Sequence, residues 1–304
     1  MRIPIFTDDA GWQGAQLKQA FAKHDVDAVF VSLQDCVIDL AQQVPNIQIP
    51  HFDTLPPAAF VRGVAGGTLQ QVITRLNVLH MLTRQGVRIY NQAQAIERTV
   101  DKAMTSFLLR MHGVATPATW VCESRAHIET IRQQAAGNGQ QLVLKPLFGS
   151  QGQGVRKLLH SEPLPVPMQQ YVDGVYYLQQ LIETADKPHD YRVFVISGKV
   201  VAAMKRQGES WVNNVASGGR CVAIEPSQQM RALALKAAQA VDIDYCGVDI
   251  IQAANGDYYV LEVNSIPAWR GLQGVTDVNI AEVLVDDFLC KSESSSANCV
   301  SNRV

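Results

Sequence analysis

The stretch GVDIIQAANGDYYVLEVN (residues 247–264) contains two apolar segments on either side of Asn255-Gly256. An Asn-Gly pair between such segments is a strong signal for a two-residue hairpin turn, in which both turn positions need positive φ. Counting outward from that turn brings Asp249 opposite Glu262. Asn264 points to the same face as Glu262, because side chains alternate along a strand. The stretch therefore predicts a β-hairpin with three oxygen-bearing side chains on one face.

These three side chains predict a cation site. Like charges directly opposite each other destabilise a sheet by roughly 0.2–1 kcal/mol, so a cation between Asp249 and Glu262 is expected. Two carboxylates and an amide suit a hard cation such as Mg²⁺, which keeps waters and shares phosphate oxygens. A surface hairpin with solvated acids is the alternative interpretation.

The composition is that of an ordinary globular protein. The 304 residues are 47% apolar and 18% charged, which is enough chain for one large domain or two to three small ones. A net charge of −2 argues against a broad nucleic-acid surface. The sequence has no signal-peptide pattern and no apolar run of the roughly 18 residues that a membrane span needs. Six cysteines without a Cys-x-x-Cys pair suit a reducing, cytoplasmic setting without a zinc site.

The first part of the chain predicts a small parallel α/β domain. Apolar segments alternate with helical patterns, and Thr68 is a suitable N-cap for a helix that runs to about Arg84. The expected strands are Arg2–Thr7, Asp27–Leu33, Phe60–Arg62 and Val87–Tyr90. Arg62 stands where a strand meets a glycine turn, the usual place for a ligand contact in such a sheet. A solvated turn arginine is the alternative.

A helix is predicted from Asp101 to Gly113, with its apolar residues on one face. That face contains Ala103, Met104, Phe107, Leu108 and Met111. Lys102 falls in the first turn, where a cation opposes the helix dipole. A phosphate partner would remove that cost, and a surface lysine is the alternative.

Lys145 stands at the end of an apolar strand, directly before a glycine-rich loop. A lysine in a buried strand needs a partner. The glycines at 149, 152 and 154 let backbone amides approach an anion closely. A strand follows the loop, which excludes the dinucleotide fingerprint, and no Gly-Lys-Ser/Thr closes it as a P-loop. We expect a glycine flap that folds over phosphates; a mobile surface hairpin is the alternative.

A second hairpin is predicted around Ser197-Gly198. A two-residue turn there would place Asp190 opposite Lys205. Four charged residues then gather at the open end of this hairpin: Asp190, Arg192, Lys205 and Arg206. The surplus of cations suggests an anionic ligand, whereas a single cross-strand salt bridge is the alternative.

The remaining pattern completes the domain organisation. A helix capped by Ser227 is expected to reach Val241, and a last helix should end at about Leu289. The predicted parts are an N-terminal α/β domain (1–95), a central part that ends in a proline-rich linker (96–167), a C-terminal part with the metal site (168–290) and a disordered polar tail (291–304).

In this order, the motifs resemble those of the ATP-grasp ligases, and most closely the RimK-like α-L-glutamate ligases. The ordered set is Asp101-Lys102, Lys145 with its glycine flap, Gln179–Glu183, Asp190-Tyr-Arg192, Asn214, Asp249 and Glu262-Val-Asn264. The resemblance covers roughly Gly86 to Leu289, and the N-terminal part more loosely. It implies an ATP-grasp fold, α/β with an α+β C-terminal part, behind a Rossmann-like pre-ATP-grasp domain.

The resemblance also implies roles for individual residues. ATP would be held by Lys102, Lys145, the flap residues Gly149, Ser150, Gln151, Gly152 and Gly154, the segment Gln179, Gln180, Leu181, Ile182 and Glu183, and by Asp190, Arg192, Lys205 and Asn214. Mg²⁺ or Mn²⁺, expected as two ions, would be held by Asp249, Glu262 and Asn264. Catalytic roles fall to Arg206 and Lys145, and substrate contacts to Arg62, Arg220 and Arg270.

Two departures from the family pattern bear on the adenine contact and on the substrate. Gln180 stands where a glutamate is common, so a backbone contact to adenine is expected. Val212 stands where the ribosomal-protein-modifying members have an arginine, which weakens the case for the same acceptor. The loop from Pro267 to Gln273 is closer to members that act on small cofactors such as tetrahydromethanopterin-type pterins. The implied reaction turns an acceptor carboxylate into an acyl phosphate, which the amine of glutamate attacks. Addition to a protein C-terminus, another carboxylate–amine ligase and an ATP-binding sensor are the alternatives. The expected partners are small molecules and a second copy of the chain, as a dimer or tetramer.

Overall fold

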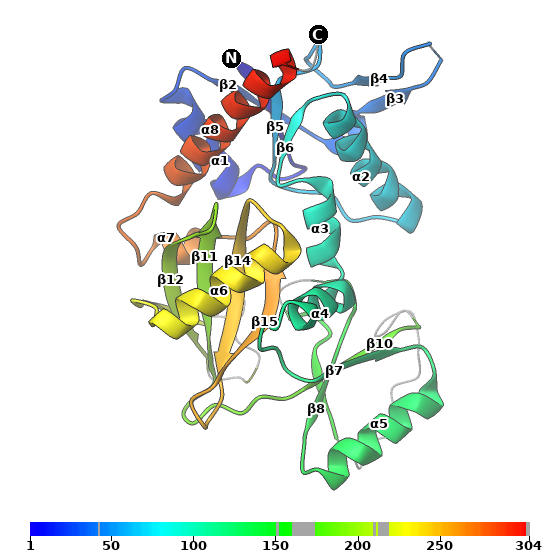
Figure 1. Ribbon diagram of the computed structural model, residues 1–304, viewed down its shortest axis with the longest axis vertical. Helices are drawn as coiled ribbons and strands as arrows, with labels where there is room; N and C mark the ends of the chain where they lie inside the picture. Colours follow the sequence, from blue (N-terminus) through cyan, green and yellow to red (C-terminus); the bar gives the residue numbers. More distant parts are fainter. Residues whose placement is uncertain (42, 150–151, 160–173, 209–210, 212–218, 302–304) are drawn as a thin grey trace.

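The structure is a computed structural model of the chain (Figure 1). It describes residues 1–304 except 42, 150–151, 160–173, 209–210, 212–218 and 302–304. The expected linker at 161–167 lies outside the described residues, as do Ser150, Gln151, Val212 and Asn214.

The N-terminal part is a parallel four-stranded sheet with the strand order β2-β1-β5-β6. Its strands are β1 (Arg2–Phe6), β2 (Asp27–Val31), β5 (Ala58–Val61) and β6 (Arg88–Tyr90). The packed helices are α1 (Gly11–Ala22) and α2 (Leu69–Arg84). The expected cap is confirmed, because Thr68 and Gln71 form a capping box at the start of α2. A short 3-10 helix, η1 (Leu33–Asp35), leads to a small hairpin of β3 (Val37–Asp39) and β4 (Asn46–Gln48) beside this sheet.

A second, antiparallel sheet follows two connecting helices, α3 (Ala93–Val100) and α4 (Lys102–Met111). Its strand order is β7-β10-β8-β9. The strands are β7 (Thr119–Cys122), β8 (Leu142–Lys145), β9 (Arg156–Leu158) and β10 (Tyr176–Gln180), with α5 (Arg125–Gly137) packed beside them. This central part has its own apolar cluster, which includes Ile128, Leu142 and Leu178.

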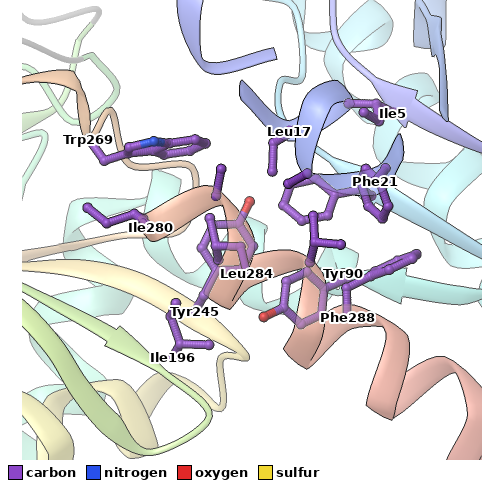
Figure 2. Packing of buried hydrophobic residues seen from close by; sticks show 14 of the residues in the cluster. Ile5, Leu17, Phe21, Tyr90, Ile196, Tyr245, Trp269, Ile280, Leu284 and Phe288 are labelled. Atoms are coloured by element: carbon purple, nitrogen blue, oxygen red, sulfur yellow. The ribbon is translucent and has the colours of Figure 1, made fainter. Parts of the chain in front are cut away.

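The third sheet has the order β13-β12-β11-β14-β15. Its strands are β11 (His189–Ile196), β12 (Lys199–Gln207), β13 (Arg220–Ala223), β14 (Tyr245–Gln252) and β15 (Tyr258–Asn264). Helix α6 (Gln228–Val241), capped by Ser227 as predicted, covers one face. On the other face, one end of the sheet packs against the N-terminal part, with Ile5, Phe21, Tyr90, Ile196 and Phe288 in one core (Figure 2). The opposite end of that face is left for polar side chains.

The last helix differs from the prediction. After the short α7 (Arg270–Gln273), α8 runs from Ile280 to Ser301, well past the expected end at Leu289. Ser292 is buried and Lys291 donates to Asp244 at 2.6 Å, so the start of the supposed disordered tail is packed. None of the described helices has the length and apolarity needed to cross a membrane.

The β14–β15 pairing is partly as predicted. Asp249 lies opposite Glu262, as expected, but the turn is one residue longer than a two-residue loop, with Gln252 opposite Tyr258. Within the Asn255-Gly256 pair, only Gly256 has positive φ (94°). A bulge beside Asp249 adds a residue to the facing strand and restores the expected pair.

The predicted β11–β12 pairing is wrong by one residue. The turn at Ser197-Gly198 is the expected two-residue type, but a bulge after Phe194 shifts everything beyond it. Asp190 therefore lies opposite Arg206, and Lys205 lies opposite Tyr191. Because side chains alternate, Lys205 points to the other face of the sheet from Asp190 and Arg206.

The predicted apolar face of α4 is largely exposed. Met104, Phe107 and Met111 retain 43%, 58% and 68% of their accessible surface. The buried side contains Thr105, Ser106 and Leu109 instead. This side is partly polar, and its Ser106 shares a hydrogen bond of 2.7 Å with Tyr177 of β10.

Candidate active site

The charged residues singled out in the sequence gather between the central sheet and the C-terminal sheet. Two backbone hydrogen bonds join these parts, from Val260 to the carbonyl of Ala115 and from Ala254 to that of Glu183. Glu262 on β15 acts electrostatically on Lys102 and Lys145, which come from the central part. The site is therefore built by two sheets, with α4 beside β15 (Figure 1).

Three oxygen-bearing side chains converge on the hairpin, as the sequence predicted. The amide nitrogen of Asn264 lies 3.1 Å from Glu262 Oε1 and 3.5 Å from Asp249 Oδ2. Both contacts use the nitrogen, so the amide must turn over for its oxygen to face the carboxylates. Glu262 has no lysine or arginine within ion-pair distance in the described part of the chain.

Asp249 also belongs to a buried ionic network. Arg192 donates through Nε to Oδ1 and through Nη2 to Oδ2 (2.9 Å), and Arg206 Nη2 lies 3.1 Å from Oδ2. Arg206 also binds both oxygens of Asp190 at 2.7 Å. All four side chains are buried. Sequence reasoning found these charges but assigned the two arginines to a ligand, whereas each one binds a carboxylate of the protein.

The network fixes the charge of Asp249 and of Arg206. Burial alone would raise the pKa of Asp249, but Arg192 and Arg206 outweigh it and hold that pKa well below its usual range. Burial alone would lower the pKa of Arg206, but Asp249 and Asp190 outweigh it and raise that pKa. Asp249 is therefore a carboxylate, and Arg206 a cation, throughout the physiological range.

The donor set suits a hard cation. Within the described residues, no three His, Cys, Asp or Glu side chains cluster as a metal site. The hairpin offers two carboxylates and an amide, which fits Mg²⁺ or Mn²⁺ if further ligands come from water or phosphate. Glu262 is the carboxylate best able to bind a cation, because Asp249 already accepts hydrogen bonds from two arginines.

A chain of hydrogen bonds holds the ammonium group of Lys145 in position. Its ammonium group donates to Gln179 Oε1 at 2.6 Å, and the Gln179 amide nitrogen lies 3.2 Å from the hydroxyl of Tyr177. That hydroxyl bonds Ser106 of α4 at 2.7 Å. Burial lowers the pKa of Lys145 to about 8. Sequence reasoning missed Tyr177 and Ser106; the available signal was a polar residue within each apolar pattern.

Lys102 links α4 to the glycine loop. It is the first residue of the helix, which Asp101 caps, and it donates to the carbonyls of Leu147 (3.3 Å) and Gly149 (2.9 Å). Burial lowers the pKa of Lys102. Gly149 and Gly154 have positive φ, and a Cβ on Gly154 would lie 2.8 Å from Pro146. The loop therefore needs glycine at 154 for both reasons.

The segment Gln179–Glu183 crosses from the central sheet to the C-terminal sheet. The amides of Gln180 and Leu181 already donate to Ala118 and Gln141, each at 2.8 Å. The amides of Ile182 and Glu183 have no partner in the described part of the chain. Within this segment, which is expected to hold ATP, these two amides are the ones free to bind a ligand.

The three arginines assigned to the substrate lie on three different segments of the chain. The guanidinium of Arg62 lies over the ring of Trp269, 5.2 Å from its centroid. Arg270 is exposed at the start of α7. Arg220 is exposed on β13 opposite Gln207, at the edge of the sheet.

Known proteins share this arrangement. The RimK-like ATP-grasp domain matches residues 99–288. The tetrahydromethanopterin:alpha-L-glutamate ligase of Methanococcus maripaludis is 30% identical over 296 residues, covering 95% of this chain and 98% of that protein. A probable alpha-L-glutamate ligase of Vibrio vulnificus is 29% identical over the whole of both chains.

Solved structures share the fold. The ATP-grasp ligase PsnB, in complex with minimal precursor, Mg and ADP, superposes with a TM-score of 0.73 at 21% identity over 96% of this chain and 97% of that one. The D-cycloserine synthetase DcsG gives 0.73 at 18% identity over 96% and 100%. The predicted ATP-grasp fold is thereby confirmed.

More than half of the chain matches the family, and a relative with 30% identity matches 95% of the chain. The chain therefore belongs to the RimK-like ATP-grasp family and is an ATP-dependent, ADP-forming ligase that makes a C–N bond.

Proposed function

We propose that this enzyme joins L-glutamate to a carboxylate of a small cofactor, with a tetrahydromethanopterin-type pterin as the acceptor. The observation that carries the proposal is the similarity to the Methanococcus maripaludis ligase, which spans 95% of the chain and so includes the N-terminal part. The tetrahydromethanopterin:alpha-L-glutamate ligase of Methanocaldococcus jannaschii is 35% identical over 224 residues.

The proposed reaction has two steps. The acceptor carboxylate attacks the γ-phosphorus of ATP, giving an acyl phosphate and ADP. The amine of glutamate then attacks the acyl carbon, and phosphate leaves. No side-chain nucleophile is needed, so the task of the protein is positioning and charge neutralisation.

The described residues suit that task. Lys102 and Lys145 are partly desolvated cations beside the glycine loop, so each gains from a phosphate partner. The amides of Ile182 and Glu183 are available to the adenine edge. Asp249, Glu262 and Asn264 would hold Mg²⁺, two ions in the full complex, and the metal would neutralise phosphate charge.

Arg206 is the residue we propose to stabilise negative charge as the acyl phosphate forms. Its guanidinium is held in position by Asp190 and Asp249, and it stays charged. Such a fixed donor needs no reorganisation during the reaction. Arg192, in contrast, acts through Asp249, which it orients by two hydrogen bonds.

The test is ADP release with Mg·ATP, L-glutamate and a reduced pterin acceptor, followed by mass spectrometry. The proposal expects release that needs both substrates and a glutamyl-sized mass gain on the pterin. A mass gain on a protein C-terminus, and none on the pterin, would identify a protein as the acceptor. Release that is independent of glutamate would discard the amino-acid assignment.

A further inference from the structure

Two buried hydrogen-bond donors lie together outside the nucleotide site. Arg62 follows β5 at the carboxyl edge of the parallel sheet, and its guanidinium stacks on Trp269 from the loop after β15. Neither Arg62 Nε nor Trp269 Nε1 has a hydrogen-bond partner within the described residues, and both atoms are buried. An unsatisfied buried donor costs free energy, and a native structure has few of them.

Four other arginines in this structure have hydrogen-bond partners in the protein. Arg192 and Arg206 bind carboxylates, Arg88 binds Asp244, and Arg75 donates to two carbonyls of the glycine turn, at 2.7 Å each. Burial lowers the pKa of Arg62, against the opposing effects of Tyr245 and Asp9. Arg62 is thus a desolvated cation without an ion-pair partner in the described part of the chain, and it remains partly exposed.

The pair lies next to the reaction site. Trp269 packs edge-on against Phe194, with ring centroids 6.3 Å apart, and Phe194 is two residues from Arg192 on β11. The same loop begins at Asn264, and its Pro267 packs beside Arg192 over Gly247. In Figure 2, Trp269 lies at the margin of the core that joins the N-terminal and C-terminal parts. If Arg62 binds one group of a ligand, the rest of that ligand can reach the β14–β15 hairpin.

We propose that Arg62 and Trp269 form a carboxylate subsite for a substrate of this ligase. The two side chains offer only donors, one of them charged, and a carboxylate has two acceptor oxygens for such a set. The inference rests on the proposed function for the identity of the substrate, and the carboxylate belongs either to glutamate or to the acceptor.

Two probes separate these sources. Binding of L-glutamate and of pteroic acid, a pterin derivative with one carboxylate and no glutamyl group, is measured by calorimetry on the full chain with Mg·ADP present. The variants are Arg62→Gln, Trp269→Phe, which keeps the ring but removes the N–H, and Arg84→Gln as the control, an exposed arginine at the end of α2.

We expect Arg62→Gln to weaken binding of one probe about tenfold and Trp269→Phe to weaken the same probe about threefold, as for the loss of a charged and a neutral hydrogen bond. Binding of Mg·ADP should be unchanged, and Arg84→Gln should bind like the wild type. Weaker binding of L-glutamate assigns the subsite to the amino acid, and weaker binding of pteroic acid assigns it to the acceptor.

Wild-type protein that binds neither probe, or variants that bind both as the wild type does, would overturn the subsite. Thermal unfolding checks that each variant folds, and Trp269→Phe keeps the test valid if Arg62→Gln does not. If the wild type makes glutamyl product but Arg62→Gln and Trp269→Phe bind both probes normally, the subsite is refuted and the proposed function stands. If the wild type makes no glutamyl product but Arg62→Gln selectively loses binding of one probe, the proposed function is refuted and the subsite stands.

Discussion

Arg192 binds Asp249 through two parallel hydrogen bonds, one of them 2.9 Å from Nη2 to Oδ2. The same carboxylate lies 3.1 Å from Arg206. Asp249 therefore has two functions that the sequence does not separate: it is a candidate metal ligand, and it is the anion that neutralises two buried arginines.

Replacing Asp249 should destabilise the fold. Asp249→Ala leaves Arg192 without a carboxylate and Arg206 with only Asp190. Breaking a buried ion pair from one side costs roughly 3–5 kcal/mol. Urea unfolding should show this loss. An Asp249→Ala protein as stable as the wild type would mean that water reaches the two guanidinium groups.

Replacing Glu262 should instead raise the Mg²⁺ requirement and spare the fold. Glu262→Gln keeps the shape of the side chain and breaks no arginine pair. We expect the Mg²⁺ requirement to rise at least about tenfold, as for loss of a metal ligand or its support. Mg²⁺ titration of ADP release measures this, with urea unfolding as the control. An unchanged Mg²⁺ dependence would refute the metal assignment.

Lys145 should make nucleotide binding depend on pH. Its pKa is about 8 in the folded protein, below the ordinary value of 10.5, so folding disfavours the charged form. Its contribution to stability is therefore least favourable below pH 8 and improves as the pH rises to 10.5. Phosphate binding has the opposite dependence, because it needs the charged form.

The affinity for Mg·ADP should thus fall above pH 8, by roughly tenfold at pH 9 for a single titrating group. Lys145→Arg keeps its charge and should give a flat profile over this range. Calorimetric titration at several pH values makes the comparison. The same fall in both proteins would assign the titration to another group.

Strand bulges limited what the sequence could predict about the site. The pair Asp249–Glu262 was predicted correctly from a two-residue turn, yet the longer turn and the bulge beside Asp249 cancel each other. On β11–β12 no second irregularity compensates, so the predicted Asp190–Lys205 pair is wrong and Arg206 takes the place of Lys205. Residue types and their order were sufficient for the fold and for the hairpin that brings Asp249, Glu262 and Asn264 together. Register depended on backbone irregularities that side-chain alternation does not reveal.

Gly247 is another feature that only the structure explains. A Cβ on this strand residue would lie 2.9 Å from Arg192 Cδ and 3.0 Å from Pro267 Cβ. Gly247→Ala should therefore push Arg192 away from Asp249, at a cost of about 1–3 kcal/mol for overpacking. Urea unfolding and ADP release should both decline. Full activity in this variant would show that Arg192 can shift without losing Asp249.

In helix α4, the face with the apolar periodicity is not the buried face. Leu109 is fully buried, whereas Phe107 is 58% exposed on the face that periodicity favours. Leu109→Ala should cost about 2–5 kcal/mol, and Phe107→Ser should change stability by no more than about 0.5 kcal/mol. Urea unfolding of the two variants compares these values directly. A large loss for Phe107→Ser, together with a smaller particle in size-exclusion chromatography, would mean that a second copy of the chain covers this face.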